Sequence, residues 1–191
     1  MKKIWLIILA VVVLLGLWMV GKFNSLVRLD QATKTAWSQV ENVYQRRADL
    51  IPNLVATVKG AAAQESGVLV AVMNARASAT KTNIDIKDAQ ALAQYQKAQG
   101  ELSSTLGRLL MVTENYPQLQ SIQAFRDLTV QLEGTENRIS VERKNYNDTA
   151  NAYLTALRFF PGNIVASLFG FIPANLFQAE TGANVAPEVK F

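Results

Sequence analysis

The chain has 191 residues, half of them hydrophobic, and carries a formal net charge of +4 at pH 7. It contains no cysteine and no histidine, which excludes disulfides, thiolate chemistry, histidine general bases and zinc sites with Cys or His ligands. A positive balance suits anionic lipid headgroups and nucleic acid alike. Because the sequence has no nucleic-acid-binding motif, we expect no nucleic-acid partner.

The chain opens with a long uncharged segment, Ile4 to Val20, preceded by Lys2 and Lys3. At ~1.5 Å rise per residue this segment reaches about 25 Å, the short end of what crosses a bilayer. A cleaved signal peptide is the alternative, but the apolar run exceeds a normal signal core and no A-x-A cleavage site follows it. We therefore predict an uncleaved transmembrane anchor over residues 1–21, with the lipid bilayer as a partner. A lipoprotein anchor would need a cysteine.

The basic residues around this segment orient it only weakly. Lys2 and Lys3 precede it, whereas Lys22, Arg28 and Lys34 follow it, so the positive-inside count is nearly balanced. A very short basic N-terminus most often stays in the cytoplasm. On that ground we expect the rest of the chain outside the cytoplasm.

Helical periodicity begins after the anchor and continues along the chain. Over residues 22–48, apolar residues recur at alternating steps of three and four. Asp49 can cap a new helix and Pro52 fits a first helical turn, which favours a helix end and restart at 48–50 over one helix kinked at Pro52. The second helix then continues to about Ala79.

Two further helices follow a polar loop over residues 80–87. Asp85 or Asp88 can cap the third helix, which continues to about Glu114. After a turn at residues 115–117, the fourth helix is sustained for about 43 residues, until Pro161 and Gly162 end it. Its apolar stripe is interrupted near Glu136 and Arg143, which indicates a polar layer. No stretch shows strand periodicity, so the predicted fold class is all-α.

These patterns predict an N-terminal transmembrane helix followed by an antiparallel up-and-down four-helix bundle and a short apolar C-terminal helical segment. The expected parts are the anchor over 1–21, the bundle over 22–160, the apolar segment over 161–178 and a flexible tail over 179–191. The up-and-down order returns the end of the fourth helix to the face where the chain leaves the membrane. Membrane contact, or contact with a neighbouring subunit, is therefore one hypothesis for the apolar residues there, and packing over the bundle end as ordinary core is the other. The candidate contact residues are Phe159, Phe160, Phe169, Phe171, Ile172, Leu176 and Phe177.

The sequence offers little for catalysis. Glu133, Glu136 and Glu142 are the remaining candidates for a carboxylate-only Mg or Mn site, but acidic residues three apart on a helix are usually only solvated. Arg46, Arg47 and Asp49 can bind an anion or acidic partner, or form a local ion cluster at a helix junction, which is the favoured interpretation. There is no phosphate-binding loop. We predict no enzyme activity, no cofactor and no metal.

Several segments resemble a known family. The block YQRRADLIPNLV over residues 44–55, followed by Val58-Lys59-Gly60, resembles the signature of the LemA family of bacterial membrane proteins. Further matches are FNSLV at 23–27, Glu65, Ala75-Arg76, ENYP at 114–117, RKNYN at 143–147 and PEVKF at 187–191. The resemblance implies a single-span anchor with a soluble up-and-down four-helix bundle, and no established activity. Many members have a Tyr and a His where this chain has Ala61 and Gln64, which counts against a catalytic or metal site there.

The residues and the resemblance together predict a non-enzymatic, membrane-anchored scaffold or adaptor in the bacterial cell envelope. We expect it in the inner membrane as a self-associating homo-oligomer with an unidentified protein partner. A membrane-shaping protein is the alternative, because proteins similar to LemA occur in bacterial organelle formation. A carboxylate-metal hydrolase is a third hypothesis.

Overall fold

The computed structural model describes residues 2–80 and 84–178, and every regular element in these ranges is helical. This confirms the predicted all-α class. The flexible tail predicted over 179–191 lies outside the described residues. The elements are α1 (Lys2–Ala61), the 3-10 turn η1 (Ala63–Glu65), α2 (Ser66–Thr80), α3 (Ala89–Thr113), α4 (Pro117–Ser121), α5 (Gln123–Arg158) and α6 (Gly162–Phe169).

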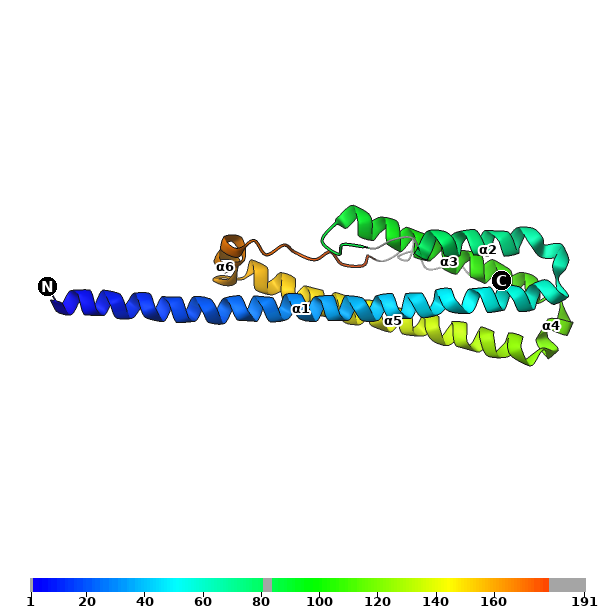
Figure 1. The fold of residues 1–191 in the computed structure, drawn as a ribbon, viewed down its shortest axis with the longest axis horizontal. Helices are drawn as coiled ribbons and strands as arrows, with labels where there is room; N and C mark the ends of the chain where they lie inside the picture. Colours follow the sequence, from blue (N-terminus) through cyan, green and yellow to red (C-terminus); the bar gives the residue numbers. More distant parts are fainter. Residues whose placement is uncertain (1, 81–83, 179–191) are drawn as a thin grey trace, which may run out of the picture.

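Helix α1 is much longer than the others and projects from the rest of the molecule (Figure 1). Its apolar start has a mean hydropathy of 2.8 over the best 18-residue window, and none of that window is buried. A helix whose side chains are apolar on every side, with no protein packed around them, is typical of a membrane span. The described chain thus has an N-terminal helix suited to a membrane anchor.

The predicted helix break at residues 48–50 is wrong, because α1 continues through Pro52 to Ala61. Proline has no backbone N–H, so it leaves the carbonyl of Ala48, four residues earlier, without its helical partner. The side chain of Arg76 on α2 fills this gap, since its Nε donates to the Ala48 carbonyl over 2.6 Å. A donor from another helix therefore removes much of the cost of the interior proline. The chain turns instead around Ala62, which precedes η1.

The long helices α1, α2, α3 and α5 alternate in direction. In Figure 1 the chain runs outward along α1, returns along α2, runs outward again along α3 and returns along α5. Helix α1 packs along α5, and α2 packs along α3. Asp88 caps α3 by accepting from the backbone N–H groups of Gln90 and Ala91, as the sequence allowed.

The predicted 43-residue fourth helix is divided into two. Ile122 has an extended backbone (φ −77°, ψ 115°) and separates the short α4 from α5. The break turns α4 across the end of the molecule, where Leu119 is completely buried. Burial of that leucine is a tertiary effect, which the helical period of the sequence did not indicate.

After α5 the chain forms α6 and then an extended C-terminal segment, residues 171–178. Gly170 ends α6 in the left-handed conformation (φ 70°), which glycine adopts without strain. The C-terminal segment then lies along the helices. The hydroxyl groups of Tyr153 and Tyr146 donate to the carbonyls of Ile172 and Asn175, over 3.0 and 2.6 Å. Asn175 also donates, through its backbone N–H, to the carbonyl of Ile86 over 2.9 Å.

The two larger clusters of buried side chains form cores with a polar layer between them, and a third, small cluster joins α6 to α1. The proximal core, on the side of the anchor, is rich in aromatic residues; the distal core is mainly aliphatic. The proximal core includes Trp37, Tyr44, Tyr95, Tyr146, Tyr153 and Phe177, and the distal core includes Ile51, Leu54, Val72, Leu102, Leu109 and Leu132. Arg47, Gln99 and Thr135 lie between these sets on α1, α3 and α5, and all three are buried.

Candidate functional site

A buried arginine lies at the centre of the polar layer. Arg47 is 1% exposed and is the one buried charged residue among those whose side chains the structure describes. It belongs to the inward stripe of α1, because Tyr44 precedes it by three residues and Ile51 follows it by four. The helical period therefore directs its side chain into the molecule.

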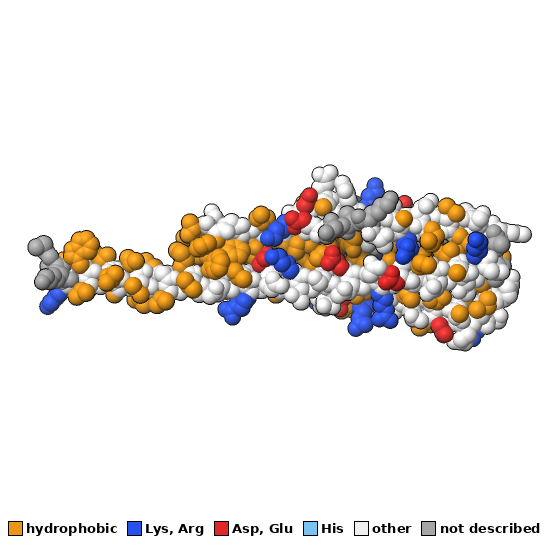
Figure 2. Space-filling model, in the orientation of Figure 1, with side chains coloured by type: hydrophobic (Ala, Val, Ile, Leu, Met, Phe, Trp, Pro, Cys, Tyr) orange, Lys and Arg blue, Asp and Glu red, His pale blue; other side chains and the backbone are white. Residues whose placement is uncertain are grey.

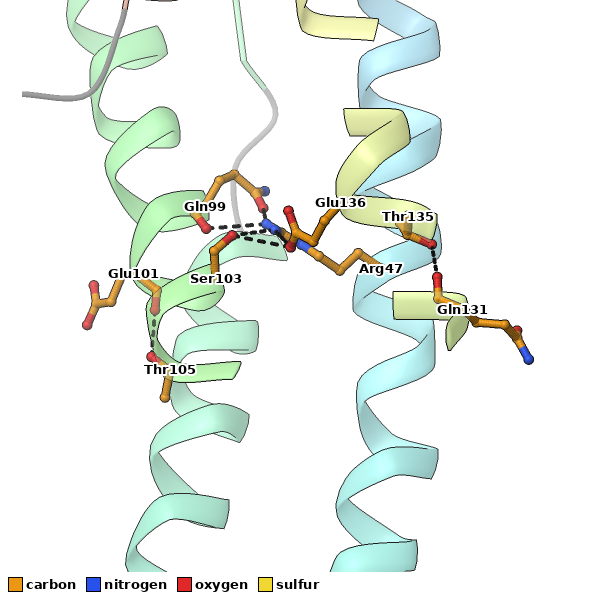
Figure 3. A network of polar contacts seen from close by, with 8 residues as sticks. All are labelled: Arg47, Gln99, Glu101, Ser103, Thr105, Gln131, Thr135 and Glu136. Carbon is orange, nitrogen blue, oxygen red and sulfur yellow. Dashed lines mark hydrogen bonds and ion pairs between the residues drawn. The ribbon is translucent and has the colours of Figure 1, made fainter. Parts of the chain in front are cut away.

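Hydrogen-bond partners from two helices, α3 and α5, surround the Arg47 guanidinium (Figure 3). One terminal nitrogen, Nη1, donates to the Ser103 hydroxyl over 2.6 Å and to the Glu136 carboxylate. The other, Nη2, donates to the side-chain and backbone oxygens of Gln99. The Gln99 amide extends the network by donating to the carbonyl of Ala79 at the end of α2, over 3.2 Å. Arg47 thus connects α1 with α3 and α5. Its Nε has no hydrogen-bond partner among the described residues.

The network forms part of the wall of a cavity between α3 and α5. The cavity has a volume of about 590 Å³, in the range of small-molecule or side-chain binding sites. Tyr44 and Arg47 contribute to it from α1. The other lining residues are Gln96, Gln99, Gly100 and Ser103 from α3, Glu136, Ile139, Ser140, Arg143 and Asn147 from α5, and Phe177 and Gln178 from the C-terminal segment.

Arg143 supplies a second cation to this cavity. Its guanidinium lies 4.7 Å from the ring centre of Phe177, and its Nη2 donates to the carbonyl of Gln178 over 3.3 Å. The Gln96 amide donates to the same carbonyl over 2.6 Å. With Arg47 paired to Glu136, no ion pair of Arg143 is found within the described ranges. The described lining of the cavity therefore carries a net positive charge.

Ionisation of the tyrosines does not provide acid–base chemistry near neutral pH. Burial raises the pKa of Tyr44, against the opposing effect of the Arg143 and Arg47 charges. Burial likewise raises the pKa of Tyr95, and the neighbouring Tyr44 adds to the rise. Both phenols stay protonated at physiological pH, so they can donate hydrogen bonds but do not act as bases. The arrangement suits binding better than proton transfer.

Comparison with known proteins places the chain in a family. The profile of the LemA family matches residues 36–191, which is most of the chain. The chain belongs to the LemA family. It is similar to magnetosome proteins MamQ 1 and MamQ 2 of Paramagnetospirillum magneticum, each 27% identical over 182 residues, with 85% of this chain and 67% of the relative covered. It is also similar to magnetosome protein MamQ of Magnetospirillum gryphiswaldense, 23% identical over 190 residues, with 88% of this chain and 70% of the relative covered.

The expected ion cluster of this LemA-family chain is not formed at a helix junction, because α1 is unbroken there. Arg47 pairs with Glu136 rather than with Asp49. Arg46 and Asp49 are exposed, and the Asp49 carboxylate accepts from the Gln45 amide over 2.8 Å. The polar layer expected near Glu136 is present.

The three candidate carboxylates do not converge. Glu136 binds Arg47, Glu142 accepts from the Asn145 amide over 3.1 Å, and Glu133 lines a different surface hollow beside α4. Within the described residues there is no group of three or more acidic side chains placed to hold a metal ion. A carboxylate-only site at these residues is therefore not supported by their geometry.

The candidate membrane or subunit contact residues are divided between the surface and the core. Phe177 is buried in the proximal core, and Phe171 and Leu176 are half-buried. The other four, Phe159, Phe160, Phe169 and Ile172, are exposed, with Phe160 reaching 80%. Phe177 thus belongs to the core, whereas contact of the exposed residues with the membrane or a subunit stays a prediction.

No role was predicted for Gln99, Ser103 or Asn147, although Asn147 lies in the RKNYN match at 143–147. Gln99 continues the inward stripe of α3 from Leu92 and Tyr95, and a polar residue in that register was the available signal. The Asn147 side chain donates to the carbonyl of Phe177 over 3.0 Å and accepts from its backbone N–H over 2.9 Å. Only the tertiary path of the C-terminal segment reveals this role.

Proposed function

We propose that this LemA-family chain is a non-enzymatic, membrane-anchored scaffold or adaptor of the bacterial cell envelope. In this proposal the helices after the anchor act as an up-and-down four-helix bundle held outside the cytoplasm at the inner membrane. The observation that carries it is the continuity of α1, which is one helix from the exposed apolar span to the distal core. Because the helix is continuous, no flexible linker separates the span from the bundle, and the bundle is held at a fixed distance from the membrane.

The polar cavity is the proposed docking site for the adaptor function. Its free positive charge and amide groups suit a carboxylate-bearing side chain of a partner protein. A photo-crosslinking residue at Ser140, on the cavity rim, should give a discrete adduct in cells. The same residue at Asn151, exposed on α5 outside the cavity, is the matched control. Equal adducts at both positions would contradict docking at the cavity.

Self-association is tested by the mass of the full-length protein in detergent and in nanodiscs. A defined oligomer in both media supports the scaffold. Removal of the whole C-terminal region is not a clean comparison, because Ala174 and Phe177 are part of the core. The aspartate substitution Phe169→Asp, at an exposed position, is the better variant. A monomer in both media, with no crosslinked partner, would contradict the scaffold and the adaptor alike.

A membrane-shaping protein is the second candidate function. The magnetosome relatives and the exposed apolar side chains beside the anchor favour it. Incubating the purified full-length protein with preformed vesicles and imaging them distinguishes the two functions. Tubulated or fragmented vesicles would favour membrane shaping, whereas unchanged vesicles with a captured partner would favour the adaptor.

A further inference from the structure

The free face of α6 is uncharged and has no partner within the described chain. Gly162, Val165 and Ala166 on its other face are buried. Ile164 and Leu168 on the free face are 53% and 64% exposed. The exposed residues that precede each of them, Asn163 and Ser167, are uncharged. The sequence has no charged residue from Phe159 to Gln178.

Helix α6 lies at the level where the anchor ends. Val165 and Ala166 pack against Leu26 of α1, with Met19 and Phe23 beside them. The Phe23 ring lies 4.8 Å from that of Phe169 and 5.6 Å from that of Phe171 between ring centres. Figure 2 shows hydrophobic side chains over this end of the molecule and along the start of α1, with most charged side chains over the helices beyond.

The length of the span identifies what covers this face. A bilayer core is about 30 Å thick and needs about 20 apolar residues, which from Ile4 reaches Phe23. The uncharged run ends at Gly21, two residues short of that length. Met19 and Phe23, on which α6 packs, therefore fall at the boundary between acyl chains and headgroups. If α1 spans the bilayer as in the proposed function, lipid surrounds it at this depth and is also within reach of the free face of α6.

The charges nearby agree with a lipid surface. Lys22 follows the span directly, Arg158 ends α5 just before Phe159, and both are exposed. Cations at this depth attract anionic headgroups. Long basic side chains can also reach outward while their stems stay in the apolar layer.

We propose that α6 is a second membrane-binding element, whose free face inserts, together with Phe159 and Phe160, into the headgroup and upper acyl region of an anionic bilayer. The chain thus contacts the membrane at two places, the span of α1 and the face of α6. This inference rests on the anchor of the proposed function. It names a lipid surface, rather than a second copy of the chain, as the occupant.

The absence of cysteine allows a direct test with single labels on the full-length chain. A polarity-sensitive fluorophore is attached to Cys in Ile164→Cys and Leu168→Cys, in nanodiscs of phosphatidylcholine and phosphatidylglycerol loaded with one copy each. Val130→Cys, also exposed but near the distal start of α5, is the matched control. Leu14→Cys, within the span, reports on the anchor itself.

Bromine on the lipid chains near the headgroup should quench the labels at 164 and 168 by roughly half, since a helix in the interface lies about 5–10 Å deep. The label at 130 should not be quenched. Bromine near the chain ends should quench position 14 more than 164 or 168. Labels at 164 and 168 that respond like position 130 would overturn the proposal. If position 14 is quenched in that case, the anchor stands and only the role of α6 fails.

A second copy as the occupant is distinguished in the same system. Discs with several copies would then shield the labels at 164 and 168, whereas single-copy discs would leave them in water. That result would also overturn lipid insertion. Ile164→Asp combined with Leu168→Asp should leave the helix content unchanged, because both side chains are exposed. The double substitution should release α6 from the lipid. A label at Phe160→Cys in the same chain should then lose its quenching by brominated lipid.

Discussion

Arg47 and Asp49 are two positions apart on α1, and this spacing determines their different environments. Residues two apart lie on different sides of a helix, so Arg47 is buried whereas Asp49 stays at the surface beside Gln45. Arg47 then needs a counter-charge from elsewhere, and Glu136 on α5 provides it. A cation that is almost completely buried is costly unless it is paired and hydrogen-bonded.

Glu136→Ala should lower the free energy of unfolding strongly, because it leaves the Arg47 cation without its counter-charge. Breaking a buried pair typically costs about 3–5 kcal/mol. The Glu136 side chain is 41% exposed, so water can take its place, and we expect a value near the lower end of that range. Denaturant titration of the full chain in detergent, followed by circular dichroism, measures it. Glu133→Ala, one turn away and exposed, should change stability by less than about 0.5 kcal/mol; equal losses would contradict the argument.

Arg76→Met should be destabilising only because Pro52 is present. The substitution removes the donor to the Ala48 carbonyl, and an unpaired buried polar group costs about 1–3 kcal/mol. In a Pro52→Ala background the residue at 52 regains an N–H that can bond that carbonyl, so the same substitution should cost less. A double-mutant cycle on unfolding free energies gives the coupling. Additive effects of the two substitutions would show that Arg76 does not act through this carbonyl.

For the candidate site, the sequence predicted a polar layer but not which residues pair within it. The interruption of the stripe near Glu136 predicted a polar layer, because a charge in an apolar register needs a partner. The identity of that partner depends on how α1 and α5 align, which the periodicity of either helix alone does not determine. Arg76 was likewise unpredictable as a partner for Ala48, since the two are 28 positions apart.

At the level of the helices, the periodicity of the sequence predicted where helical segments lie, but it did not predict the continuity of α1 at residues 48–50 or the break at Ile122. Local rules place a helix start near Pro52, yet α1 continues because α2 supplies a donor. The same rules predict one continuous helix after Pro117, yet Leu119 is buried across the end of the molecule and the helix breaks at Ile122. In both cases tertiary contacts outweigh the local signal.

The C-terminal segment should become less stable at alkaline pH through Tyr153. Burial raises the pKa of this phenol from 10.0 to about 12, and the Asp30 carboxylate adds to the rise. The folded state therefore holds the proton more tightly than the unfolded chain. The stability this provides is present below pH 10 and is lost as pH rises from about 10 to about 12.

Tyr153→Phe tests this dependence. At pH 8 the variant should lose about 0.5–1.5 kcal/mol, because the hydrogen bond to the Ile172 carbonyl is absent. Near pH 12 the loss should shrink or reverse, since phenylalanine has no proton to release. Unfolding midpoints of both proteins at several pH values measure the difference. A constant difference across the range would contradict the assigned ionisation.

At the scale of the whole molecule, α1 sets the distance between the membrane and the distal core. Residues 21–61 form about 60 Å of helix at ~1.5 Å per residue. Atomic force microscopy of the protein in supported bilayers should therefore find particles rising about 60 Å above the lipid, or slightly less if α1 tilts. A bilayer without protein gives the baseline. Heights near half that value would show that the bundle lies on the membrane instead of standing on it.

The position of the C-terminal segment has a consequence for synthesis. Ala174 and Phe177 complete the proximal core around Trp37 and Tyr146, and they are translated after all the residues of the distal core. The distal core is assembled from residues 51–132 and can form while the nascent chain is still growing. The half nearest the membrane is completed only when residues 174–177 have left the ribosome. Until then its aromatic side chains stay uncovered beside the bilayer, although Trp37 and Tyr44 are made before the distal core.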